Sequence, residues 1–228
     1  MTAPQASVTR WWWIRHAPVD SGGRIYGAGD PDCRCDDEAV FDALASVLPR
    51  PAVWVASHLR RTHQTAAAVA RYLDAMPDLE IEPRFGEQSF GEWQGRTHDE
   101  VRRERLPEWH RFWLAPALEA PPGGESFTAM VERVRAGVVE LTDRHRGQDI
   151  VAFAHGGTIR AALAVALEID PERALPFAVD NCSLTCLEHF DSPRHSADEA
   201  RDAWRVVKVN LLPMSPAGQL VRPPLVTL

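Results

Sequence analysis

The sequence has no long apolar run and no leader-like start. None of its apolar runs approaches the roughly 20 residues that a membrane-spanning helix needs. Residues 1–7 lack the positively charged stretch and following apolar stretch that mark a secretion signal. We therefore expect a cytoplasmic protein with no membrane partner.

The chain also has few cysteines and no net positive charge. The four cysteines are Cys33, Cys35, Cys182 and Cys186, and their spacings do not match zinc sites. We expect reduced thiols and no metal or cofactor, with Cys182 and Cys186 packing as small apolar groups on one face of a strand. The 25 basic residues against 32 acidic ones give a net charge of −7, which excludes nucleic acid as the main partner. A small phosphorylated ligand stays possible, because it needs only a local cluster of positive groups.

Short apolar runs alternate with amphipathic helical patterns along most of the chain. Apolar runs predict strands at 9–14, 52–56, 79–83, 150–154, 183–188 and 204–211. Helical spacing predicts helices at 38–48, 60–75, about 126–146 and 157–168. This alternation predicts an α/β fold, a three-layer α/β/α sandwich in which a mainly parallel sheet has helices on both faces.

The length of 228 residues suits a single domain, so we expect residues 1–228 to form one. Its core is expected at about 8–212. Residues 84–124 carry short helical patterns and many prolines, and they predict a small helical lid insertion. The polar stretch 191–202 is expected to be a solvated excursion, and the proline-rich tail 213–228 to be irregular.

Four clusters of polar residues follow four of the predicted strands. They are Arg15-His16, residues 57–66, residues 87–95 and residues 155–158. In an open parallel sheet, the residues just past the carboxyl ends of the strands face the ligand crevice. The four clusters are therefore expected to meet at one edge of the sheet.

These residue types suit phosphoryl transfer. A neutral imidazole can attack phosphorus and form a phosphohistidine. The planar arginine fork can clamp phosphoryl oxygens, and a helix that opens after Gly156-Gly157 adds backbone N–H groups. A carboxylic acid must protonate the leaving oxygen, and Glu87 is the candidate, with Glu92 and Asp99 as competitors.

The motifs around these clusters resemble those of the histidine phosphatase superfamily, which includes cofactor-dependent phosphoglycerate mutases. Arg15-His16-Ala17 is similar to the family's Arg-His-Gly, and residues 57–66 match Ser-x-Leu-x-Arg-[Ala/Thr]-x-Gln-Thr-Ala. Residues 87–95 match Glu-x-x-[Phe/Tyr]-Gly-x-Trp-x-Gly, and residues 155–160 match His-Gly-Gly-x-Ile-Arg. Residues 123–126 resemble the family's Gly-Gly-Glu-Ser. The resemblance covers about residues 8–212 and implies the phosphoglycerate mutase-like fold.

The resemblance also implies roles. His16 would be the phosphorylated nucleophile and Glu87 the proton donor, with His155 as a second catalytic histidine and no metal. The implied phosphate-binding residues are Arg15, Arg61, His155 and Gly156. The motif match selects Arg61 rather than its neighbour Arg60.

Two positions depart from the family pattern. Ala17 replaces the motif glycine, and its methyl group could tighten the pocket or restrict φ. Gly22 stands where several members carry an asparagine. The Arg-His-Ala-Pro-Val form resembles the branch related to α-ribazole phosphatase.

We therefore expect a phosphatase that acts on a small phosphate monoester, with α-ribazole 5′-phosphate as one candidate. One alternative is a phosphoglycerate mutase-type isomerase, although the mutase-type strings are absent here. Two further alternatives are a non-catalytic phosphate-binding or scaffold protein and a protein phosphohistidine phosphatase. Trp109, Phe112 and Trp113 either line the lid over the substrate or pack it, and His58 and His63 lie near the pocket. The sequence gives no oligomeric state.

Overall fold

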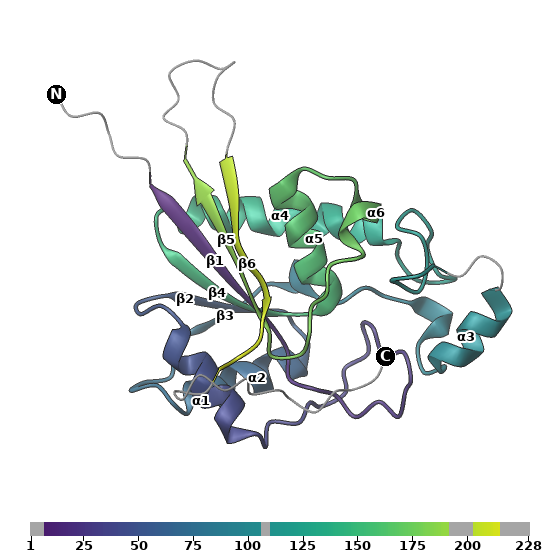
Figure 1. Ribbon diagram of the computed structural model, residues 1–228, viewed down its shortest axis with the longest axis horizontal. Helices are drawn as coiled ribbons and strands as arrows, with labels where there is room; N and C mark the ends of the chain where they lie inside the picture. Colours follow the sequence, from purple (N-terminus) through teal and green to yellow (C-terminus); the bar gives the residue numbers. More distant parts are fainter. Residues whose placement is uncertain (1–6, 106–109, 192–202, 215–228) are drawn as a thin grey trace, which may run out of the picture.

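A six-stranded sheet forms the centre of the protein (Figure 1). The computed structural model describes residues 7–105, 110–191 and 203–214. The strands are β1 (Val8–Arg15), β2 (Val53–Ala56), β3 (Leu79–Ile81), β4 (Asp149–Ala154), β5 (Leu184–Phe190) and β6 (Ala203–Leu211). Their order is β3-β2-β4-β1-β5-β6, and the pairs β3/β2, β2/β4 and β4/β1 are parallel. The mainly parallel sheet predicted from the sequence is confirmed, with antiparallel pairing only at β5 and β6.

The tryptophan run shows why β1 occupies the middle of the sheet. Alternate side chains of a strand point to opposite faces, so Trp11 and Trp13 share one face and both are fully buried. Their rings stack with centroids 4.9 Å apart. The indole N–H of Trp11 donates to the Thr142 hydroxyl at 3.0 Å, which satisfies the polar atom inside the core.

Helices cover both faces of the sheet, which gives the predicted three-layer sandwich. In Figure 1, α1 (Glu38–Val47) and α2 (Arg60–Ala70) lie below the sheet. On the opposite face lie α4 (Phe127–Arg144), α5 (Gly156–Leu167) and the short α6 (Pro171–Ala174). Each helical layer closes its own apolar core against the sheet.

Some predicted boundaries and placements were wrong. Helix α2 ends at Ala70, whereas helical spacing predicted an end near residue 75. The amides of Tyr72 and Leu73 bond carbonyls three residues back, so the chain continues as tight turns that keep the apolar side chains against the core. Cys182 precedes β5 with φ of 58° and shares no strand face with Cys186, although both thiols are buried as expected.

The segment after β3 carries three short helices, η1 (Pro83–Phe85), η2 (Gly91–Trp93) and α3 (His98–Arg105). In Figure 1, α3 lies at the far side of the molecule from the free ends of β1, β5 and β6. A separate small apolar cluster holds this segment, and the isolated bridge Arg24↔Thr97 joins it to the loop after β1. That it moves as a lid stays a prediction.

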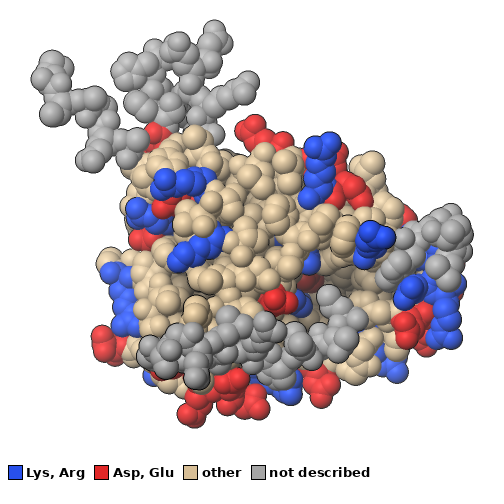
Figure 2. All heavy atoms as spheres, in the orientation of Figure 1, with Lys and Arg blue, Asp and Glu red and all other residues tan. Residues whose placement is uncertain are grey.

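Several expectations fall outside the described residues: Trp109, residues 192–202 of the polar stretch, and residues 215–228 of the tail. Among the helices that the structure describes, none combines the length and apolar character required to cross a membrane. On the face shown in Figure 2, acidic and basic side chains are interspersed and form no single large basic patch.

Candidate active site

The four polar clusters meet at the carboxyl edge of the sheet, as predicted. At this edge, backbone hydrogen bonds between neighbouring strands continue for one residue past the ends of β1, β2 and β3. The amide of His16 donates to Ala154 at 2.9 Å, the amide of Ser57 to Phe153 at 3.2 Å, and the amide of Glu82 to Ala56 at 2.8 Å. Three clusters therefore start within one residue of the end of a strand, whereas residues 87–95 follow β3 after the short helix η1, and the parallel register brings the strand ends together.

His16 is buried and holds one tautomer. Its side chain is 1% exposed. Its Nδ1 lies 2.7 Å from the Ala17 carbonyl oxygen, which can only accept, so Nδ1 carries the hydrogen. The lone pair of the neutral ring is then on Nε2, which has no hydrogen-bond partner among the described residues. Burial, followed by the positive charges of Arg61 and Arg15, lowers the pKa of His16 well below 6.5.

His155 is also fully buried, and its ring centroid lies 5.2 Å from that of His16. The Arg61 Nε donates to His155 Nδ1 at 3.2 Å, so Nδ1 accepts and Nε2 carries the hydrogen. That Nε2 lies 2.7 Å from the hydroxyl oxygen of Ser57. Burial and the charge of Arg61 lower the pKa of His155 well below 6.5. Both imidazoles are therefore neutral at pH 7.

Backbone carbonyls rather than carboxylates hold Arg61. Its Nη1 donates to the Gly29 carbonyl at 2.6 Å and its Nη2 to the Gly27 carbonyl at 2.8 Å. No carboxylate lies within ion-pair distance of it among the described residues. A glycine is required at 27, because φ is +43° and a Cβ there would lie 2.6 Å from Phe90. Burial lowers the pKa of Arg61, and the negative charges of Glu87 and Asp30 offset part of that effect.

Arg15 and Glu87 lie beside the start of α5. The Arg15 Nη1 donates to the Val179 carbonyl at 2.6 Å, while its buried Nε has no partner among the described residues. Glu87 accepts from the Gln88 amide at 3.0 Å and from the Gly157 amide at 3.3 Å. A Cβ at Gly157 would lie 2.3 Å from a Glu87 oxygen, so the close approach of carboxylate and helix requires this glycine.

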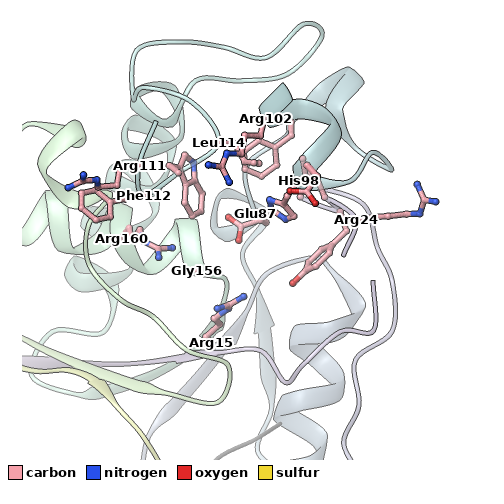
Figure 3. A pocket seen from close by; sticks show the side chains of 16 residues that line it. Arg15, Arg24, Glu87, His98, Arg102, Arg111, Phe112, Leu114, Gly156 and Arg160 are labelled. Atoms are coloured by element: carbon pink, nitrogen blue, oxygen red, sulfur yellow. The ribbon is translucent and has the colours of Figure 1, made fainter. Parts of the chain in front are cut away.

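A cavity of about 330 Å³ opens beside these residues (Figure 3). Arg15, Glu87 and Gly156 line it, whereas His16, Arg61 and His155 lie buried behind its wall. The structure thus brings the predicted site residues together, but three of them do not contact the open space. Of the two competitors of Glu87, Asp99 lines the cavity and Glu92 does not.

The cavity also has lining residues to which sequence reasoning gave no role. These are Arg24, Ile25, Tyr26, Gly27, Phe90, His98, Arg102, Arg111, Leu114 and Arg160. Arg160 follows Gly156 by one helical turn, and that i to i+4 spacing is the signal that could have placed it here. The others come from irregular loops and α3, where no periodicity predicts which side chains converge.

Two of the aromatic residues considered from the sequence lie at the cavity, and that they cover a substrate stays a prediction. Phe112 and Trp113 line the cavity, and Trp113 also packs edge-on against Phe127, with centroids 6.1 Å apart. His58 and His63 do not line the cavity.

Ala17 is tolerated by the backbone. It is not among the residues of the described chain with positive φ, so the site does not require the glycine of the family motif. Its amide donates to the Thr65 hydroxyl at 2.8 Å, and the residue is fully buried. The methyl group therefore packs in the wall behind His16 without backbone strain.

No group of three or more His, Cys, Asp or Glu side chains in the described ranges could hold a metal ion. The four cysteines are free thiols, with the sulfurs of Cys33 and Cys35 3.5 Å apart.

Known proteins are similar in sequence to this chain over most of its length. A bifunctional protein of Mycobacterium tuberculosis is 32% identical over 194 residues, which are 83% of this chain but 52% of that protein. The chain thus spans about half the length of this relative. Phosphoserine phosphatase 1 of Hydrogenobacter thermophilus is 31% identical over 189 residues, which cover 80% of this chain and 87% of that protein.

Solved structures agree with the fold. A mycobacterial glucosyl-3-phosphoglycerate phosphatase, solved in complex with VO3, has a TM-score of 0.74 and 28% identity, over 89% of this chain and 98% of that one. An α-ribazole phosphatase from Shigella flexneri has a TM-score of 0.66 but 22% identity, over 88% of this chain and 96% of that one, which shows the fold alone.

The family comparison covers most of the sheet and the whole candidate site. The sequence profile of the histidine phosphatase superfamily (branch 1) matches residues 11–198. This range runs from β1 past β5 and contains the two facing imidazoles, the arginine held by carbonyls and the carboxylate at the start of α5. The chain therefore belongs to the histidine phosphatase superfamily.

Proposed function

We propose that this protein is a phosphatase that hydrolyses a small phosphate monoester through a phosphohistidine on His16. One observation carries the proposal: a neutral, buried imidazole whose free lone pair is on Nε2, next to two arginines that form no ion pair with a carboxylate of the described residues. In the first step the Nε2 lone pair forms a bond to phosphorus, and the bond between phosphorus and the ester oxygen breaks. The ester oxygen leaves with a proton.

Glu87 is proposed to supply that proton. Its carboxyl group lines the cavity, and two backbone amides hold it beside the start of α5. In the second step the ionised Glu87 takes a proton from water. The resulting oxygen nucleophile attacks the phosphohistidine, the bond between phosphorus and nitrogen breaks, and inorganic phosphate leaves with the site restored.

Positively charged arginines and backbone N–H donors in fixed positions would hold the phosphoryl group. Arg15 and Arg61 offer permanently charged forks, and the amide of Gly156 adds a donor at a helix start. His155 already carries a hydrogen on Nε2, and burial, followed by the charge of Arg61, lowers its pKa; a bound dianion would offset the arginine charges and favour the protonated ring, which has N–H on both nitrogens. Stabilisation of charge by groups already in place is the main catalytic effect in phosphoryl transfer.

The substrate is proposed to be a small phosphorylated metabolite rather than nucleic acid or a membrane component, given the net charge of −7. Relatives at 31% identity are named for phosphoserine and for glucosyl-3-phosphoglycerate. α-Ribazole 5′-phosphate stays a candidate and belongs in the same assay panel. We further propose that residues 1–228 form one domain, in which the segment 84–124 covers the substrate.

The test is phosphate release from this panel with EDTA present, including p-nitrophenyl phosphate, for wild type and His16→Ala. We expect release that is lost in His16→Ala and retained in His145→Ala, which removes a histidine that does not line the cavity. Wild type should also form an acid-labile phosphoprotein.

Other outcomes separate the alternatives. Exchange between 2- and 3-phosphoglycerate that depends on a bisphosphate primer, without release of phosphate, would show a mutase. Equal phosphate release by wild type and His16→Ala would refute the proposed nucleophile. Tight phosphate binding with neither release nor phosphoprotein formation would indicate a non-catalytic binder.

A further inference from the structure

The cavity is lined by more arginines than the proposed phosphoryl transfer employs, since only Arg15 among them has a role in it. Five arginines line it: Arg15, Arg24, Arg102, Arg111 and Arg160. Among the described residues, two carboxylates line it, Glu87 and Asp99. This local balance is opposite to that of the whole chain, whose net charge is −7. In Figure 3, Arg160 and Arg111 lie on one side of Glu87, Arg24 lies on the other, and Arg15 lies below.

Arg160 differs from the exposed arginines because it is 8% exposed and immobilised. Its Nε donates to the Phe177 carbonyl at 2.8 Å. Its guanidinium carbon lies 4.7 Å from the centre of the Trp113 ring, which is within the range of a cation–π contact. No carboxylate forms an ion pair with it in the part of the chain that the structure describes. Burial, with a smaller contribution from Arg15, lowers its pKa to about 10, so it remains charged at neutral pH.

The indole that supports Arg160 is itself fixed. The Trp113 Nε1 donates to the Gln88 side-chain oxygen at 2.8 Å, and the Gln88 Nε2 donates to the Glu125 carbonyl at 2.8 Å. Gln88 is adjacent in sequence to Glu87. The position of Arg160 is therefore fixed relative to the proposed proton donor. A cation that is fixed in advance binds an anion with little loss of side-chain entropy.

The free donors of Arg160 lie next to the proposed phosphoryl site. A Cβ built on Gly156 would be 3.1 Å from the Arg160 Nη1 and 3.6 Å from the Arg15 Nε. Because Nε is occupied by Phe177, Nη1 and Nη2 form the free end of the fork. An end-on pair of parallel N–H donors matches the two oxygens of a planar carboxylate. The cavity of about 330 Å³ equals the volume of roughly eleven water molecules, which leaves room for more than a phosphoryl group.

We propose that Arg160 binds a second anionic group, a carboxylate, on the non-transferred part of the substrate. The substrate class is then a phosphate monoester that also carries a carboxylate. This inference rests on the proposed phosphatase function. Glu87 and Asp180 act on the Arg160 charge without forming an ion pair with it among the described residues, so a substrate carboxylate bound directly to the free end of the fork would be the first such partner.

The first test uses wild-type enzyme and two matched pairs of substrates. 3-Phosphoglycerate and glycerol 3-phosphate differ by a carboxylate in place of a hydroxymethyl group, and O-phosphoserine and phosphoethanolamine differ only by the carboxylate. We expect kcat/KM to favour the carboxylate member at least roughly tenfold in at least one pair, as a charge-assisted bond implies. If neither carboxylate is favoured while the enzyme hydrolyses p-nitrophenyl phosphate, the inference is wrong and the phosphatase proposal stands. If no ester is hydrolysed, the phosphatase proposal itself fails.

The second test assigns the preference to Arg160. Arg160→Gln should lower kcat/KM for the favoured carboxylate substrate by roughly ten- to a hundredfold, but for its partner without the carboxylate by less than about threefold. Arg160→Lys should recover part of the preference. Arg173→Gln, which removes a charge from an exposed position on α6, should leave both values unchanged. Equal losses for both members of a pair, in a variant that melts like wild type, would mean that Arg160 contacts the transferred phosphoryl group instead.

Discussion

The two buried imidazoles should make the protein lose stability in mildly acidic solution. His16 and His155 are 1% and 0% exposed, and burial together with neighbouring arginine charge lowers both pKa values well below 6.5. Above pH 6.5 the rings are neutral in both the folded and the unfolded chain. Below it the unfolded chain takes up protons that the folded chain excludes, so the free energy of unfolding falls with falling pH.

The magnitude follows from this difference in bound protons. For a histidine that stays neutral in the folded state, lowering the pH from 7.5 to 5.5 costs about 1.4 kcal/mol. The two rings together should cost about 2.7 kcal/mol, a large part of the roughly 5–15 kcal/mol that stabilises a typical domain. Carboxylates that are held ionised by ion pairs titrate at lower pH and add little in this window.

Urea unfolding at pH 7.5 and 5.5 measures this effect. The comparison is between wild type and the variants His16→Gln and His155→Gln, which cannot take up the proton. Each variant should lose about 1.4 kcal/mol less than wild type between the two pH values, whatever its stability at pH 7.5. Equal losses in wild type and both variants would show that the two rings titrate in the folded protein as they do in the unfolded chain, so that burial does not exclude the proton. A smaller loss in wild type than in the variants would show that the rings are already charged in the folded protein. The proposed nucleophile would then lack its lone pair.

Three substitutions test other parts of the site. Gly157→Ala places a Cβ 2.3 Å from a Glu87 oxygen, so kcat should fall by at least about tenfold through displacement of the carboxylate, as measured by steady-state kinetics. Ser57→Ala removes the 2.7 Å contact to His155 and should lower thermal stability by about 1 kcal/mol as well as kcat/KM; unchanged kinetics would refute a positioning role for the hydroxyl. Ala17→Gly should not raise kcat, because Ala17 is unstrained, and it should cost about 0.5–1 kcal/mol in urea unfolding through added freedom of the unfolded chain.

The layers of the fold were predictable because burial on both sides imposes a simple pattern. Parallel strands covered by helices are nearly continuous apolar runs, as in β4, and the run of three tryptophans fits β1 for the same reason. The convergence of Arg15, His16 and His155 followed from the same rule, since parallel strands end at one edge. The ends of helices were less predictable. After α2 the chain forms tight turns in which apolar residues still follow helical spacing, so the sequence pattern continues past the end of the helix.

The walls of the cavity could not be predicted in this way. Arg24 and Arg102 come from the loop after β1 and from α3, and their meeting with Arg160 of α5 depends on loop conformations that leave no periodic pattern. The carbonyls that hold Arg61 belong to Gly27 and Gly29, more than 30 residues away in the chain. Local motifs identify the residues that react, whereas substrate specificity depends on contacts between distant segments.

The state of His16 argues for catalysis rather than for binding alone. A site that only bound phosphate would be best served by N–H donors on every side, because phosphate oxygens are acceptors. Here the Ala17 carbonyl fixes the hydrogen on Nδ1, and burial beside two arginines keeps a second proton off Nε2. A lone pair at that position repels a phosphate oxygen but is the group required to attack phosphorus. The surrounding cations can then draw in an anion while His16 offers it a nucleophile, which a scaffold would have no reason to maintain.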